Sequence, residues 1–191
     1  TLPCQQELIS SYLLRHQGIL KPSAKPYIIG FLGMPGLGKT TLAKKLSEAF
    51  HLPILERDDI RRFLHSQGHS VSAHDLVEAI SQATLHHYLS RKHSLILDAD
   101  LIALNENLQP ILKAHKATLF TIQLTCPEEV VFERIRQRNP TDADAYIAVY
   151  NERKILHQTH PLPFDFSFDS HLPSAPQFQH LAAQLKRLLN S

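Results

Sequence analysis

Cysteine, tryptophan and long apolar runs are scarce or missing in this sequence of 191 residues. It contains two cysteines, Cys4 and Cys126, and no tryptophan. Two cysteines without a C-x-x-C pair argue against a disulfide framework and suit a reducing compartment, so we expect the cytoplasm. No apolar run approaches the roughly 20 residues that span a bilayer, which argues against a membrane-spanning helix. The segment 1–7 lacks the basic start and apolar core of a signal peptide, so none is expected.

Neither sign of charge is in excess. Lysine and arginine total 20 against 18 aspartate and glutamate, a formal net charge of +2. A nearly neutral net charge is unlike that of a protein whose main role is to bind nucleic acid, although it does not exclude a nucleic-acid substrate. The length suits one domain, residues 1–191, that can bury a core without disulfides.

The segment Gly33 to Thr40 reads Gly-Met-Pro-Gly-Leu-Gly-Lys-Thr and fits the pattern G-x-x-x-x-G-K-[S/T]. The apolar run before it predicts a buried strand, and the helical spacing after it predicts a helix. In that context the glycines let backbone N–H groups point at phosphate oxygens, and the helix adds its positive dipole end. Lys39 would reach the β- and γ-phosphates, and Thr40 would ligate Mg²⁺. We therefore expect ATP and Mg²⁺ as cofactors, with the nucleotide contacted by Gly33, Pro35, Gly36, Leu37, Gly38, Lys39, Thr40 and Thr41.

Strand and helix signals alternate along the chain. Strands are expected at 27–32, 52–56, 94–97, 118–124 and 166–168. Helices are expected at 4–17, 59–66, 72–91, 105–115 and 128–138, then from 141 and from 174. This alternation predicts an α/β fold of the three-layer P-loop NTPase class, with a mainly parallel five-stranded sheet and ligands at the carboxyl ends of the strands. Residues 1–26 are expected to form an N-terminal helical appendage with its linker, and about 139–160 a lid-like segment.

Carboxylates follow the second and third strands. Phosphoryl transfer to a hydroxyl needs a carboxylate that orients it and accepts its proton, and Asp58 is the candidate base. The alternative is that Asp58 only caps the following helix. Arg61 lies one turn further on and could grip an anionic group of the acceptor, or simply form a surface salt bridge. Asp98 ends a strand as a Walker-B acid does, with a role beside Mg²⁺, and Asp100 is a second choice.

Two arginines lie four residues apart near the end of the helix 128–138. Arg134 and Arg138 share a helix face and could contact nucleotide phosphates, whereas Arg136 faces elsewhere. The alternative is an ordinary solvated basic face. The 13 histidines offer no ligand set, since His157 and His160 have a suggestive spacing but no third ligand. No metal other than Mg²⁺ is expected.

These motifs occur in the order found in a known family. Together with the P-loop, the runs Arg57-Asp58-Asp59-Ile60-Arg61, Leu97-Asp98-Ala99-Asp100 and Glu133-Arg134-Ile135-Arg136-Gln137-Arg138 resemble those of P-loop kinases of the polynucleotide 5′-hydroxyl kinase type. Zeta toxins and chloramphenicol phosphotransferase are related to that family, and the resemblance spans about residues 27 to 170. It implies that Asp58 is the base, that Arg61 binds the acceptor and that Asp98 lies beside the transferring phosphate. It also implies that Arg138, with Arg134, is a lid arginine.

One position departs from this family. Asp100 stands where Thr or Asn is frequent, and an extra carboxylate would repel an anionic acceptor. This position favours an acceptor other than a nucleic-acid end, although such an end remains among the candidates.

Two functions are compatible with these sequence features. An ATP-dependent kinase acting on a hydroxyl is favoured, because a base and a lid arginine are both predicted. The alternative is a nucleotide-gated binding module whose interaction surface is formed by residues 1–20 and the C-terminal helix. The absence of N-K-x-D and L-S-G-G-Q runs argues against a GTPase and an ABC ATPase. The segments 62–90 and 139–165, which would build the acceptor pocket, carry no motif, so the sequence sets neither the acceptor nor the oligomeric state.

Overall fold

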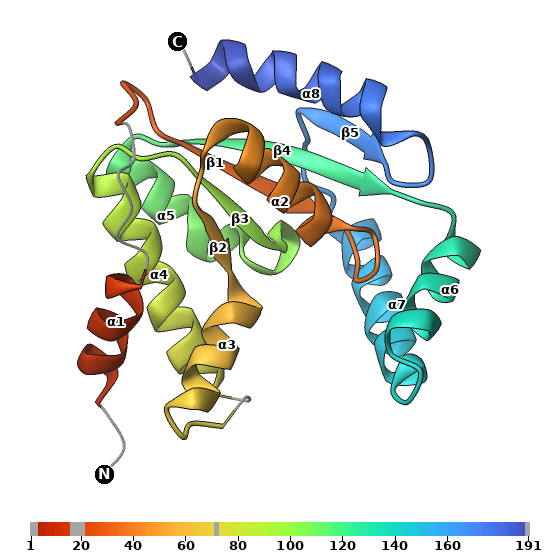
Figure 1. Cartoon of the computed structure of the whole chain (residues 1–191), viewed down its shortest axis with the longest axis horizontal. Coiled ribbons are helices and arrows are strands. Elements are labelled where there is room, and N and C mark those ends of the chain that lie inside the picture. Colours follow the sequence, from red (N-terminus) through yellow and green to blue (C-terminus); the bar gives the residue numbers. More distant parts are fainter. Residues whose placement is uncertain (1–3, 16–21, 71–72, 190–191) are drawn as a thin grey trace.

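A parallel sheet forms the centre of the molecule in the computed structural model, which describes residues 4–15, 22–70 and 73–189 (Figure 1). Within these residues the sheet has five strands in the order β2-β3-β1-β4-β5, and every neighbouring pair is parallel. The strands are β1 (Tyr27–Leu32), β2 (Ile54–Glu56), β3 (Leu95–Asp100), β4 (Thr118–Thr125) and β5 (Phe166–Asp169). All strands of a parallel sheet end at the same edge, so the loops that follow them can build one site.

Helices cover both faces of the sheet. They are α1 (Gln5–Leu14), α2 (Lys39–Phe50), α3 (Arg57–Ser66), α4 (His74–Ser90), α5 (Asn105–His115), α6 (Glu128–Arg138), α7 (Ala143–Thr159) and α8 (Ser174–Leu189), with the 3-10 turn η1 (Leu101–Ala103). One apolar core packs α1, α3, α4 and α5 against the sheet, and a second packs α2, α6 and α8 against the other face. Neighbouring residues of β1 belong to different cores, Ile28 to the first and Ile29 to the second, because side chains alternate along a strand. The three-layer fold expected from the sequence is confirmed.

Several expected boundaries shift by a few residues. β2 begins at Ile54 rather than at Leu52, since Pro53 has no N–H to donate, although its carbonyl accepts from Ile96 N at 2.9 Å. α3 begins at Arg57 rather than at residue 59. The expected first residue of α4, Ser72, lies outside the described residues.

The N-terminal helix is integrated into the first core. Leu8 and Tyr12 are buried against α3 and α4. The Tyr12 hydroxyl donates to Asp59 Oδ2 at 3.0 Å, and its ring meets Phe63 edge-on with centroids 5.3 Å apart. This contact connects the N-terminal helix directly to the helix that carries the Asp-Asp-x-Arg motif. Among the described residues, no helix is both long and apolar enough to cross a membrane.

Candidate active site

The loop between β1 and α2 is shaped by glycines. Gly36 and Gly38 have φ values of 84° and 95°, in the left-handed region that residues with a Cβ avoid. A Cβ on Gly36 would lie 2.9 Å from a methyl carbon of Val131 and 3.1 Å from Ile135, so α6 packs directly on the loop. The Leu37 side chain is buried in the core and does not line the cleft, so only its backbone is available to a nucleotide.

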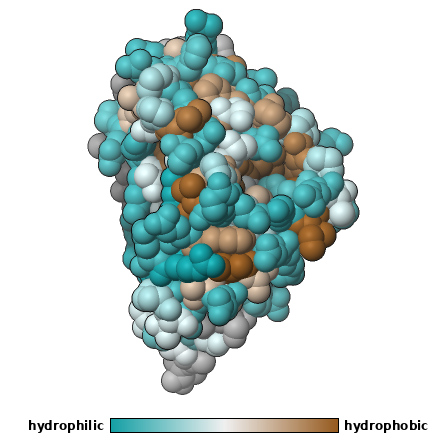
Figure 2. Space-filling view, turned by 90° about the vertical axis from the view of Figure 1, so that its right-hand side faces the viewer, coloured by the Kyte–Doolittle hydropathy of each residue, from teal (hydrophilic) through white to brown (hydrophobic). Residues whose placement is uncertain are grey.

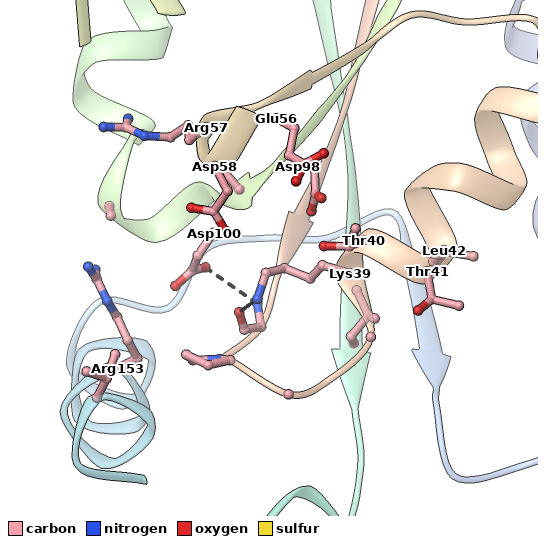
Figure 3. Close-up of a pocket in the computed structure, with 18 of the residues that line it drawn as sticks. Lys39, Thr40, Thr41, Leu42, Glu56, Arg57, Asp58, Asp98, Asp100 and Arg153 are labelled. Carbon is pink, nitrogen blue, oxygen red and sulfur yellow. Dashed lines mark hydrogen bonds between the residues drawn. The ribbon is translucent and has the colours of Figure 1, made fainter. Parts of the chain in front are cut away.

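Lys39 is held inside this loop. Its Nζ donates to Gly33 O at 2.6 Å and to Met34 O at 2.9 Å. Burial lowers the pKa of Lys39, and the nearby carboxylates of Asp100 and Asp98 act in the opposite direction. The ammonium group therefore lies at the centre of the loop, facing the carboxylates at the end of β3 (Figure 3).

Asp98 and Thr40 form a pair of oxygen donors at the start of α2. The Thr40 hydroxyl hydrogen-bonds to Asp98, which lowers the pKa of that carboxyl, but burial outweighs this effect and the net pKa is raised. Parallel pairing of β2 and β3 places Glu56 beside Asp98, which raises the pKa further (Figure 3). Carboxylate and hydroxyl oxygens are the ligands that Mg²⁺ prefers, so this donor set fits the expected ion.

The two neighbouring aspartates of α3 have different surroundings. Asp59 is bound by Tyr12 and lies 3.4 Å from Arg62 Nη2, on the side of α3 that faces α1. Asp58 lines the cleft, its side chain is 72% exposed, and it points toward the P-loop region (Figure 3). Asp58 is not the N-cap of α3, a position taken by Glu56 without a side-chain bond. The chain thus presents one of the two carboxylates to the cleft.

Arg61 and Arg57, also on α3, both make ion pairs. Arg61 Nη1 lies 2.5 Å from Asp58 Oδ1, the salt bridge weighed above, and it also lines the cleft. Arg57 Nη1 lies 2.9 Å from Glu78 Oε2 on α4. Nothing in the sequence marked the second pair, because its partners lie on different helices.

The arginines of α6 have separate contacts. Arg134 donates to the side chain and the carbonyl of Ser170, both at 2.9 Å, and so fixes the turn after β5 beside the P-loop. Arg138 lines the cleft at the last residue of α6, whereas Arg136 is exposed outside it. Arg138 is exposed as Arg136 is, so the alternative of a solvated face is excluded for Arg134 alone.

One face of α7 forms a wall of the cleft that the sequence reading missed. Tyr146, Val149 and Arg153 line the cleft from this face, and Arg153 points into it (Figure 3). One turn later His157 Nε2 lies 3.0 Å from both carboxylate oxygens of Asp100. The spacing 146, 149, 153 and 157 follows one helical face and was the available signal.

These groups surround a single large cleft of about 1060 Å³ at the carboxyl ends of the strands. Among the expected site residues, those whose side chains or backbone line it are Gly33, Pro35, Gly36, Gly38, Lys39, Thr40, Thr41, Asp58, Arg61, Asp98, Arg134 and Arg138. Only Leu37 does not. Segments more than 100 residues apart in the chain thus meet at one site.

The sheet order and the P-loop after β1 define a P-loop kinase fold. Residues 28–157 match the family described as AAA domain, and the chain belongs to that family. No curated protein matches the chain in sequence.

Solved structures share the fold. A protein from Chloroflexus aurantiacus J-10-fl, assigned provisionally as a kinase, has a TM-score of 0.65 at 20% identity and covers 85% of this chain and 98% of its own. A gluconokinase from Sinorhizobium meliloti 1021 has a TM-score of 0.58 at 18% identity, covering 88% and 95%. A structure from the PezAT toxin–antitoxin system of Streptococcus pneumoniae has a TM-score of 0.63 at 14% identity, covering 96% and 93%. At these identities the likeness shows the fold.

Proposed function

We propose that this protein is an ATP-dependent kinase that transfers the γ-phosphate to a hydroxyl of a small molecule. The observation that carries the proposal is the position of Asp58, a carboxylate in the same cleft as Lys39 and the Thr40–Asp98 pair. A protein that only binds nucleotide as a switch needs the loop but has no use for a carboxylate that would orient an acceptor hydroxyl. The kinases among the structural relatives agree with this function.

Each part of the cleft has a role in the proposed reaction. The loop amides and Lys39 bind the β- and γ-phosphates, and Thr40 with Asp98 would hold Mg²⁺, which neutralises phosphate charge when bound. Asp58 orients the acceptor hydroxyl and accepts its proton as the new P–O bond forms. Arg138 contributes positive charge where negative charge accumulates on the transferring group.

The switch alternative has less support. It requires α1 and α8 to form one surface, but α1 belongs to the core on one face of the sheet and α8 to the core on the other (Figure 1). In the described residues the two helices therefore do not adjoin.

The test compares the two aspartates of α3 after a screen for ATP consumption with hydroxyl-bearing acceptors. Asp58→Asn should retain ATP binding and lose about 10²- to 10⁴-fold in transfer rate, because the general base is removed. The matched variant Asp59→Asn should keep most of the rate, since Asp59 faces Tyr12 rather than the cleft. An inactive Asp59→Asn together with an active Asp58→Asn would refute the assignment of the base.

A further inference from the structure

The charged side chains on one side of the cleft are already neutralised by each other. We call this side the acceptor half and define it by Arg57, Asp58 and Arg61 of α3, Glu78 of α4 and Asp100 of β3. Arg57 pairs with Glu78 at 2.9 Å, Arg61 pairs with Asp58 at 2.5 Å, and the oxygens of Asp100 lie 3.0 Å from His157. Glu78 also accepts from Gln82 at 3.0 Å and from Asn107 at 3.4 Å. No cation of the acceptor half is left for a ligand anion.

Several other cations of the cleft lie outside the acceptor half as defined here. Lys39 donates to loop carbonyls and faces the carboxylates of Asp100 and Asp98. Arg138 and Arg153 line the cleft and form no ion pair with any residue that the structure describes. Arg153 lies close enough to Lys39 for its charge to lower the Lys39 pKa. The triphosphate of ATP is strongly anionic, so we assign these cations to it rather than to the acceptor.

The Asp100–His157 contact leads to the same conclusion. The imidazole of His157 lies against both carboxylate oxygens of Asp100, so it is not available to a second anion. Both side chains are largely shielded from water, at 16% and 14% exposure.

We propose that the phosphate acceptor is an uncharged, hydroxyl-bearing small molecule, an inference that rests on the proposed kinase function. An anionic acceptor would have to compete with an existing ion pair, and the part-buried Arg57–Glu78 pair would leave Glu78 without its partner, which counts against such an acceptor. Tyr146 and Val149 of α7 add apolar surface to the cleft, with 44% and 41% of their surfaces exposed. Figure 2, which views the molecule from the right-hand side of Figure 1, shows apolar residues scattered among polar ones on that face. An uncharged ring carrying hydroxyls suits both kinds of surface.

The first test measures whether the acceptor half binds an anion. The full chain is saturated with Mg²⁺ and a non-hydrolysable ATP analogue, so that the P-loop is occupied, and is then titrated calorimetrically with inorganic phosphate. We expect no saturable binding by the wild type. Glu78→Gln frees Arg57, and Asp58→Asn frees Arg61. Each variant should acquire saturable phosphate binding, with an affinity at least about tenfold higher than that of the wild type.

A matched control removes the same charge elsewhere. Glu152→Gln changes an exposed residue of α7 that does not line the cleft, so it should acquire no phosphate binding. Saturable phosphate binding by the wild type that Arg61→Gln abolishes would overturn the inference, and so would the absence of any gain in both charge-freeing variants. The titration requires no phosphate transfer, so its failure is distinct from a failure of the kinase proposal, which would appear as ATP binding without transfer to any acceptor.

Transfer assays give a second measurement with matched acceptors. Glucose should be phosphorylated in preference to gluconate, and a nucleoside in preference to its 3′-monophosphate. Faster transfer to the anionic member of such a pair would refute an uncharged acceptor.

Discussion

Two adjacent aspartates of α3 have different surroundings, and only one of them faces the cleft. Asp58 and Asp59 have the same side chain, but a helix turns by about 100° per residue, so they cannot face the same way. Asp59 meets Tyr12 from α1, and Asp58 faces the P-loop. The sequence motif predicted that Asp58 was the functional one, but the reason, the contact from α1, involves residues 47 positions apart and could not be inferred locally.

Asp98 gives a prediction in which stability and function move in opposite directions. Its pKa is raised by burial, so the folded chain binds a proton more tightly than the unfolded chain. The stability contributed by this group is therefore present below its ordinary pKa of 3.8 and is lost as the pH rises through the raised folded value. Asp98→Asn removes the buried charge and should raise the melting temperature at neutral pH by roughly 2–4 °C, which corresponds to about 1 kcal/mol.

The same variant should lose Mg²⁺-dependent tightening of ATP binding, because the carboxylate would hold the ion together with Thr40. Thermal unfolding with and without Mg²⁺ and ATP measures both effects. A less stable variant with unchanged Mg²⁺ dependence would contradict this account of Asp98. Glu106→Gln on α5, exposed and outside the cleft, serves as the control and should change neither quantity.

At the scale of elements, the end of α6 was well predicted because proline determines it. The residue before a proline avoids helical conformation, and Asn139 has φ −133° and ψ 66°, so the helix ends at Arg138. The path of α7 across the cleft was not predicted, because its contacts, Asp100 among them, come from β3 and are set by packing. The expected lid function of about 139–160 remains a prediction.

Arginines two residues apart on α6 should differ sharply in function. Arg138→Ala should lower the transfer rate by up to about 10³-fold, the lower end of the range for arginines that stabilise phosphoryl transfer, with a much smaller effect on ATP affinity. Arg136→Ala, exposed outside the cleft, should be nearly silent. Steady-state kinetics, with ATP binding measured in parallel, tests this difference. Equally small effects of the two changes on the transfer rate would indicate that both arginines are ordinary solvated surface residues.

At the scale of the whole molecule, the layers of the fold were predictable, whereas the packing of its N-terminal helix was not. The alternation of strands and helices, with the P-loop after the first strand, predicted the layers. Leu8 and Tyr12 of the N-terminal helix are buried in the first core. That this helix also contacts α3 depends on the three-dimensional arrangement of residues far apart in sequence.

Tyr12 should contribute to stability through its hydroxyl as well as its ring. Tyr12→Phe keeps the packing on Phe63 but removes the bond to Asp59, so it should lower the free energy of unfolding by about 1 kcal/mol. Denaturant unfolding measures the change. Tyr146→Phe, whose ring is 44% exposed, is the control and should be neutral, and equal effects of the two changes would show that the Tyr12 bond does not stabilise the fold.

The central claim is that the loop around Lys39 binds Mg²⁺ and ATP, and calorimetric titration of ATP in the presence of Mg²⁺ tests it most directly. The wild type should bind at one site. Lys39→Ala should bind at least about tenfold more weakly, because the ammonium group at the centre of the loop is lost. Lys44→Ala, exposed on α2 outside the cleft, should bind as the wild type does. A wild type that binds no ATP, or a Lys39→Ala variant with unchanged affinity, would contradict the account.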